Sequence, residues 1–489
     1  MGMGVCEIAY CETMISFVQK YSWHILLGLL LLLILLWLPG TRFPVVSDTA
    51  IYALLGESLW KDGSYKLLGE SYAKHLPFHA FASYPLTQLF GMQLGMQLSS
   101  LLAGGAVLLL SFFLFARVAD SFVALLTSVF ILFHHGFLYM AQVGSADFLF
   151  TSLVLASVYG FLRADQDDRW YLLSGAALGL ACLTRYNGVP LFAVFGLWVL
   201  FHRRDHLYSL WFWVGMGFGV LLFALWPLRN FLVFGDPLYS EYTGELGQQA
   251  PSLVHQFLSN LFYYGNPLQN ILPLLLLLSL YGLLRYWRKY LFFVCVMGAL
   301  WILTAIWWVQ ALRFAFPGYV FLLFFAVLGL RDVCQRMSPA GFPSFEGGAR
   351  GGGSVVWKYT CIGCITVLIV THTAAICLYT YGSCNSVVDR LVPQISANLG
   401  LSSEGFYTWS LARDYINEYA EESSFFLVES GVNRRVWEEG VFREDIQLVS
   451  SREESCPLYE ITREPKEGVE ILYQTEASPV TSVVQYRCK

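Results

Sequence analysis

The chain has 489 residues, of which 56% are hydrophobic and only 13% are charged, and its mean hydropathy is +0.55. Soluble globular domains carry about 25% charged residues, so this composition excludes a soluble globular protein and indicates an all-α polytopic membrane bundle. The formal net charge of −5 is small and spread along the chain, which gives a nucleic-acid partner no electrostatic support.

Apolar segments that could form membrane helices recur along most of the chain. A crossing needs about twenty apolar residues, and on this basis we expect about eleven spans. The first is expected to be retained, because its apolar run is not followed by a small-residue cleavage site. The predicted spans lie at 23–39, 92–116, 121–138, 147–162, 171–184, 188–201, 208–226, 271–285, 290–309, 314–330 and 355–380.

Basic residues set the expected orientation, because short cytoplasmic loops are enriched in Lys and Arg. If the N-terminus is cytoplasmic, the inner loops hold most of the Lys and Arg residues of 1–381. Residues 40–91 then form the first outer loop, and an odd number of spans places the tail outside as well. We therefore expect a transmembrane domain over 1–381 and an extracytoplasmic domain over 382–489.

The tail differs in composition from the rest of the chain, with more charge and shorter apolar runs. Residues 407–419 have the pattern of a helix and 425–428 that of a buried strand. Further strand-like segments lie at 440–449 and 459–473. These predict a small α/β domain that recognises an acceptor or caps the bundle.

Ionisable residues gather at predicted helix ends on the outer side. Asp48 follows the first span and Asp147 opens the fourth, whereas Arg185, Arg229 and Arg313 each lie beside a span end. Ionisable groups at membrane depth are costly and usually face a cavity or one another. Together the five residues indicate a site for an anionic ligand, although each one alone is equally explained as an interfacial anchor that snorkels to water.

The long segment between the seventh and eighth predicted spans has a helical rhythm over 252–264. Its apolar residues are Leu253, Phe257, Leu258, Leu261 and Phe262. This spacing predicts an amphipathic helix on the outer interface. We expect it to roof the site and to contact the acceptor.

A series of short motifs runs along residues 20–330. It comprises Ser47-Asp48-Thr49-Ala50-Ile51-Tyr52, Gly63-Ser64-Tyr65, Pro77-Phe78-His79, Leu89-Phe90-Gly91, Ser145-Ala146-Asp147, GLACLTR at 179–185, WPLRN at 226–230, FGDP at 234–237 and RFAFP at 313–317. In order, spacing and common sidedness the series resembles the GT-C superfamily of polyprenyl-phosphate-sugar-dependent glycosyltransferases, in particular the protein O-mannosyltransferases and the lipid A aminoarabinose transferases. The acidic motif of that superfamily is often Asp-Glu, and Thr49 stands here at the second position.

The resemblance implies transfer of a sugar from a dolichyl- or undecaprenyl-phosphate donor to an acceptor hydroxyl on the extracytoplasmic face, with inversion. The implied partners are this donor, the lipid bilayer and an acceptor that is a protein, a glycolipid or a cell-wall polymer. Such a transfer needs a base for the acceptor proton and cations for the departing phosphate. We predict that Asp48 is the base. The predicted substrate-binding residues are Tyr52, Lys74, His79, Asp147, Arg185, Arg229, Asn230 and Arg313.

Some of these residues have simpler alternative explanations. Arg229 and Arg313 are preferred over Arg185 for the phosphate, whereas Lys74 and His79 are also explained as ordinary interfacial polar residues.

A different class of function, a transporter or flippase of a lipid-linked or anionic substrate, would also be polytopic. Such transporters usually contain internal repeats, and we find none in this sequence.

Histidine spacing does not predict a metal site. His134 and His135 are adjacent, so on a helix their side chains would point about 100° apart. His75 and His79 have helical spacing, but Pro77 between them argues against a helix through both. No metal or cofactor is predicted, and a divalent ion has no support in the sequence.

Overall fold

The computed structural model describes residues 21–38, 41, 48–67, 69–242, 252–265, 273–307, 309–336, 415–416, 418–420, 425–428, 447–448, 458–462, 470–474 and 482–486. The chain divides into two compact units. The first contains Met1–Pro39, Ser100–Ala141 and Ala146–Ser383, and the second contains Gly40–Ser99, Gln142–Ser145 and Cys384–Lys489. The predicted span at 355–380 lies outside the described residues.

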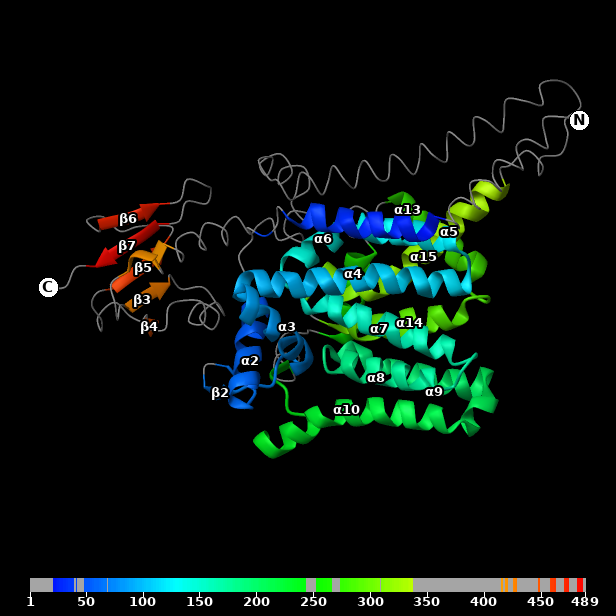
Figure 1. Cartoon of the computed structure of the whole chain (residues 1–489), viewed down its shortest axis with the longest axis horizontal. Helices are drawn as coiled ribbons and strands as arrows, with labels where there is room; N and C mark the ends of the chain where they lie inside the picture. The colour runs from blue at the N-terminus through cyan, green and yellow to red at the C-terminus, as the bar shows by residue number, and fades with distance from the viewer. Residues whose placement is uncertain are drawn as a thin grey trace, which may run out of the picture. The chain divides into compact units, whose positions relative to one another are not determined.

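The first unit is a bundle of helices that lie side by side (Figure 1). An apolar helix covers Tyr21–Trp37. The helices that follow are α4 (Met92–Val118, which begins in the second unit), α5 (Ser121–Leu132), α6 (His135–Gln142), α7 (Ala146–Arg163), α8 (Trp170–Cys182), α9 (Pro190–His202), α10 (Leu210–Phe234), α12 (Leu253–Tyr264), α13 (Pro273–Tyr286), α14 (Leu291–Ile306) and α15 (Leu312–Arg336), with 3-10 turns η2 (Tyr186–Gly188) and η3 (Arg204–Tyr208).

The predicted membrane bundle is confirmed in its broad outline. In the part of the chain that the structure describes, four helices are long and apolar enough to cross a membrane, namely α4, α7, α10 and the segment Leu312–Val333 of α15, and several apolar helices are shorter. Residues 315–330 of α15 are all buried, which places this helix in the core. The count of eleven spans and the N-in orientation stay predictions.

Close helix contacts through glycine hold part of the bundle together. Gly175 on α8 faces Gly215 on α10 so closely that an added Cβ would lie 1.7 Å from the Gly215 carbonyl oxygen. Gly179 meets Gly219 one turn further along. Small residues four apart allow membrane helices to approach backbone to backbone. This packing fixes α8, which leads to Arg185, against α10, which carries Arg229.

Helix α10 is longer than the sequence predicts. We expected the span to end at residue 226, but the helix continues through Pro227 to Phe234. Proline is tolerated in membrane helices where neighbouring groups satisfy the freed carbonyl. The predicted setting of Arg229 at a helix end is therefore wrong, because Arg229 lies inside α10.

Two further helix predictions need correction. The span predicted at 121–138 consists of two helices, α5 and α6, which residues 133 and 134 separate. His79, which we placed in a loop, lies in the first turn of α3. Proline is favoured in a first helical turn because its fixed φ suits the helix and its missing N–H is not needed there. Pro77 therefore begins this helix and leaves His75 outside it.

The N-terminal part of the second unit contains two helices joined by a short hairpin. Its elements are α2 (Asp48–Asp62), β1 (Lys66–Leu67), β2 (Glu70–Ser71) and α3 (Pro77–Phe90), with β1 and β2 antiparallel. Gly56 of α2 lies against α3, where an added Cβ would be 2.5 Å from the Ala80 carbonyl oxygen. Trp60 stacks on Phe81 and donates a hydrogen bond to its carbonyl. The described residues of 48–90, which we predicted to belong to the first outer loop, thus form a packed structure rather than an irregular connection.

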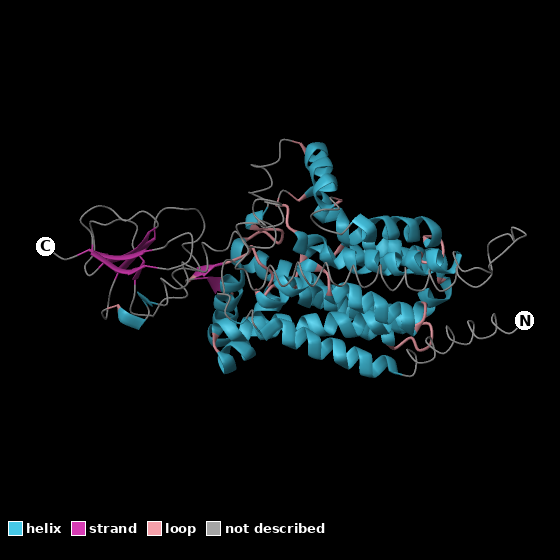
Figure 2. Cartoon of the chain, turned by 90° about the horizontal axis from the view of Figure 1, so that it is seen from above, coloured by secondary structure: helices cyan, strands magenta, loops and turns pink. Residues whose placement is uncertain are grey.

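The C-terminal part of the second unit contains a five-stranded mixed sheet (Figure 2). The strands are β3 (Phe425–Val428), β4 (Gln447–Leu448), β5 (Leu458–Thr462), β6 (Glu470–Gln474) and β7 (Ser482–Tyr486), in the order β4-β3-β5-β7-β6. β3 is parallel to β4 and β5, and the remaining pairs are antiparallel. The predicted strand at 425–428 is confirmed, whereas the segment at 459–473 forms two strands and β7 was not predicted. The α/β domain and its boundaries stay predictions.

Candidate active site

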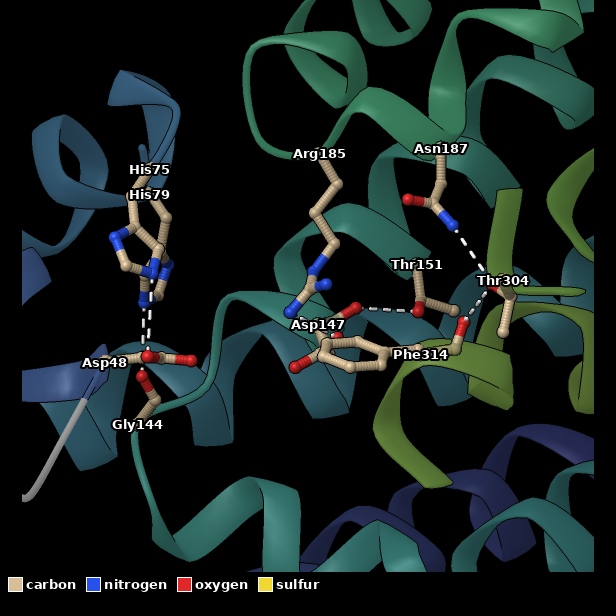
Figure 3. A network of polar contacts seen from close by, with 10 residues as sticks. All are labelled: Asp48, His75, His79, Gly144, Asp147, Thr151, Arg185, Asn187, Thr304 and Phe314. Carbon is tan, nitrogen blue, oxygen red and sulfur yellow. Dashed lines mark hydrogen bonds and ion pairs between the residues drawn. The ribbon is translucent and has the colours of Figure 1, made fainter. Parts of the chain in front are cut away.

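Asp48 is the first residue of α2. The unpaired N–H groups at a helix N-terminus favour a negative charge there. The carboxylate Oδ1 lies 3.5 Å from Nε2 of His75, and the Asp48 side chain is 32% exposed whereas that of His75 is only 6% exposed. The acid is therefore open to solvent on one side and held by a buried imidazole on the other (Figure 3).

His75 is itself fixed by two tyrosines. The Tyr72 hydroxyl is hydrogen-bonded to Nδ1 of His75, and the Tyr65 hydroxyl donates to the His75 carbonyl oxygen over 3.1 Å. In the sequence analysis, His75 was weighed only as a metal ligand. The contact between His75 and Asp48 was missed because His75 lies in a loop that follows α2 by more than ten residues.

Tyr52 and His79, both predicted site residues, pack behind this pair. The Tyr52 ring is edge-on to both imidazoles, with its centroid 4.9 Å from that of His75 and 4.8 Å from that of His79. His79 is fully buried, and its Nε2 lies 3.2 Å from the Gly144 carbonyl oxygen. Both residues are therefore packed in the interior rather than facing solvent. Lys74, which precedes His75, is half-buried.

A second group of predicted residues gathers in the first unit. Asp147 lies in the first turn of α7 and is fully buried. Its Oδ1 is 2.8 Å from an Nη atom of Arg185, which follows α8 and is 19% exposed. A buried charge needs a partner of this kind, because leaving it unpaired in the interior is strongly unfavourable. Figure 3 shows the Arg185 side chain extending from its loop to Asp147.

Phe314 brings two of the predicted arginines together. The Cζ atom of Arg185 lies 5.0 Å from the centroid of the Phe314 ring, and that of Arg313 lies 5.1 Å from it. The backbone of Phe314 is fixed from α14, because its carbonyl oxygen accepts a hydrogen bond from the Thr304 hydroxyl over 3.2 Å. Thr304 in turn accepts one from Asn187 over 3.1 Å. None of Phe314, Thr304 and Asn187 was predicted as a site residue. Phe314 lies within the RFAFP motif at 313–317, but no pattern in the sequence singles out Thr304 or Asn187.

Arg229 and Asn230 make their described contacts along α10 and the turn that follows it. The Arg229 guanidinium lies over the rings of Trp226 and Phe234, at 5.1 Å from each centroid, and donates to Asn230 Oδ1. Trp226 donates a hydrogen bond of 2.9 Å to the Tyr186 hydroxyl. A ligand role for Arg229 and Asn230 stays a prediction.

The histidine candidates for metal binding have other surroundings. His134 is buried and lies against the rings of Phe316 and Tyr319, so its environment is that of the core. The residues that the structure describes contain no group of three or more His, Cys, Asp or Glu side chains placed to hold a metal ion.

Known proteins resemble this chain in part of its sequence and in its fold. Residues 74–226 match the family model described as dolichyl-phosphate-mannose-protein mannosyltransferase. No curated protein matches the chain.

The solved structures similar to this chain include two of ArnT from Cupriavidus metallidurans. The structure bound to undecaprenyl phosphate has a TM-score of 0.60 at 14% identity, over 95% of this chain and 98% of that one. The apo structure has a TM-score of 0.53 at the same identity and coverage. The archaeal oligosaccharyltransferase AglB from Archaeoglobus fulgidus, in complex with an inhibitory peptide and a dolichol-phosphate, has a TM-score of 0.52 at 12% identity, over 86% of this chain and 64% of that one.

These likenesses extend over nearly the whole chain, but at such low identity they establish the fold and not the activity. Together with the family match, they confirm the resemblance that the sequence motifs predict. The chain has the membrane fold of the GT-C glycosyltransferase superfamily.

Proposed function

We propose that this chain is a membrane glycosyltransferase that moves a sugar from a polyprenyl phosphate to an acceptor hydroxyl on the extracytoplasmic face. The family match and the shared fold support this reaction class. The polyprenyl phosphates in the similar ArnT and AglB structures support a lipid-linked donor. The acceptor is a protein, a glycolipid or a cell-wall polymer.

The observation that carries the proposal is the environment of Arg185. Its Nε is buried and, within the described part of the chain, has no hydrogen-bond acceptor, although Asp147 pairs with the same guanidinium. A buried donor without a partner is rare and calls for an explanation. A phosphate oxygen would satisfy it, and Arg313 lies beside the same Phe314 ring. Arginine suits this task because its planar fork binds phosphate through two hydrogen bonds and keeps its charge.

The departing phosphate is the group that gains negative charge as the sugar is transferred. Cations placed in advance around such a group stabilise the transition state more than the ground state. We assign this role to Arg185 and Arg313. Asp147 keeps the Arg185 guanidinium oriented, so that little reorganisation is needed during the reaction.

Asp48 is assigned as the general base. Its carboxylate takes the proton of the acceptor hydroxyl while the acceptor oxygen forms a bond to the anomeric carbon. The bond from that carbon to the phosphate oxygen breaks in the same step, and the polyprenyl phosphate leaves as an anion. One displacement of this kind inverts the anomeric centre. His75 supports the role because it holds one carboxylate oxygen, while the partial exposure of Asp48 allows an acceptor to approach.

The experiment compares membranes that contain the wild type, Asp48→Asn or Asp62→Asn, supplied with radiolabelled dolichyl-phosphate or undecaprenyl-phosphate sugars. Asp48→Asn keeps the shape and removes the basicity, so we expect transfer to fall by roughly 10² to 10⁴, the usual contribution of general base catalysis. Asp62 is an exposed carboxylate at the other end of the same helix, and Asp62→Asn should transfer like the wild type. A folded Asp48→Asn variant with wild-type transfer would refute the assignment.

A further inference from the structure

Helix α12 is polar on the side that faces the protein and apolar on the side that faces outward. Gln256 and Asn260 are buried. Apart from His255, the exposed residues of the helix are apolar, namely Leu253, Val254, Phe257, Leu258, Leu261 and Phe262. An amphipathic helix on a soluble protein has the opposite arrangement. In α12 the exposed apolar side suits contact with lipid, and the polar side is available for contacts within the bundle.

The polar side of α12 binds the C-terminal end of α14. The side-chain amide of Asn260 donates to the carbonyl oxygens of Thr304, Ala305 and Trp307 over 3.1, 3.0 and 2.7 Å. Gln256 donates to the Trp307 carbonyl over 2.8 Å. The last four carbonyls of a helix have no partner within it, and an unsatisfied carbonyl is costly in a membrane. Asn260 therefore caps α14 from a separate helix.

The same side of α12 also holds the turn between α14 and α15. Gln310 donates to Ser259 over 2.8 Å and to Asn260 Oδ1 over 3.1 Å. The Tyr264 hydroxyl accepts a hydrogen bond from the Ala311 backbone N–H over 3.4 Å. Helix α15 begins at the next residue, Leu312. These contacts end at Ala311, two residues before Arg313 of the proposed phosphate site and three before Phe314, which both arginines contact.

We propose that Asn260 is a positioning residue, which sets the place of Arg313 and Phe314 by fixing the α14–α15 turn. The ligand in this inference, a polyprenyl phosphate, rests on the proposed function. Asn260 is fully buried, and both its amide hydrogens and its carbonyl oxygen are engaged, so it has little freedom to change conformation. Geometry is decisive at such a site, because a misplacement of about 1 Å can cost about a hundredfold in rate.

The central variant is Asn260→Asp, which keeps the side-chain shape, removes both N–H donors and sets a carboxylate against three carbonyl oxygens. The matched control is Ser252→Ala. Ser252 caps the N-terminus of α12 by accepting from the His255 N–H over 3.1 Å, so its loss weakens the same helix without removing a contact to α14. A second control, Phe262→Ala, changes the exposed side.

Three measurements are made on the purified full chain: melting temperature, amide hydrogen exchange of residues 309–313, and affinity for undecaprenyl phosphate. We expect Asn260→Asp to speed exchange in this segment and to weaken the affinity by about tenfold or more. Ser252→Ala should lower the melting temperature but keep the affinity within about twofold of the wild type. Phe262→Ala should resemble the wild type in exchange and affinity.

The inference is overturned if Asn260→Asp binds undecaprenyl phosphate as tightly as the wild type, or if Ser252→Ala weakens binding equally, since α12 would then act through general stability alone. A wild type that binds no polyprenyl phosphate and transfers no sugar would refute the proposed function instead. In that case the exchange data still decide whether Asn260 holds the turn, because they need no ligand.

Discussion

The buried pair of Asp147 and Arg185 allows a quantitative prediction about stability. Its N–O distance is 2.8 Å, so with an effective dielectric constant of about 20 the attraction is roughly 6 kcal/mol. Most of this gain offsets the cost of removing both charges from water. Removing one partner, in contrast, leaves the other charge buried and uncompensated, which typically costs about 3–5 kcal/mol.

The two single variants should differ in a defined direction. Arg185→Gln leaves a carboxylate that is only 1% exposed, whereas Asp147→Asn leaves a guanidinium that is 19% exposed and can reach water in part. We therefore expect Arg185→Gln to cost about 5 kcal/mol and Asp147→Asn about 3 kcal/mol. The double variant contains two neutral amides that can hydrogen-bond to each other. It should be no less stable than Arg185→Gln alone, which gives a coupling energy of about 3 kcal/mol.

The assay is a double-mutant cycle in mixed detergent micelles, with unfolding by SDS followed through tryptophan fluorescence. Additive losses in the double variant would show that the two side chains do not depend on each other in the folded protein. A larger loss for Asp147→Asn than for Arg185→Gln would refute the reasoning from burial, even if the coupling were found.

Two further predictions concern the surroundings of the acid. His75→Gln removes the described contact between His75 and Asp48, and because that carboxylate is partly exposed the pair contributes at most about 1 kcal/mol. We expect transfer to fall by no more than about fivefold, and a loss as large as that of Asp48→Asn, measured in the same membranes, would assign His75 a direct part in the reaction. Gly144→Ala places a side chain at φ +72°, where its Cβ would lie 2.5 Å from Thr49 Cγ2. The left-handed backbone alone costs about 1–2 kcal/mol, so the melting temperature in detergent should fall, and an unchanged value would contradict this account.

The sequence predicted local features well where one physical signal dominates. Apolar runs located the helices because a membrane helix must be apolar over its length, and the amphipathic rhythm over 252–264 located α12 to within a residue. The errors concern where the helices end. Helix α10 continues past the predicted end at residue 226 through Pro227 to Phe234, and the apolar run at 121–138 is broken by a turn around His134, whose ring packs against aromatic side chains of α15.

The candidate residues were found from the sequence, but their partners were not. Motif order pointed to Asp48, Asp147, Arg185 and Arg313 one by one. Two findings depend on contacts between elements that are separated in the chain. His75 contacts Asp48, and the Phe314 ring contacts both Arg185 and Arg313. The sequence drew attention to His75 only through its spacing to His79 and to Phe314 only as part of the RFAFP motif, and neither pattern indicates these contacts.

Helix α12 shows what each level of structure decides. The spacing of its apolar residues determined that it is a helix with two unlike sides, since the helical period follows from the backbone alone. The tertiary structure decided which side faces the protein. The end of α14 presents carbonyl groups that need donors, and Asn260 and Gln256 supply them. The side of α12 that contacts lipid has to be apolar, so the polar side faces the helix bundle.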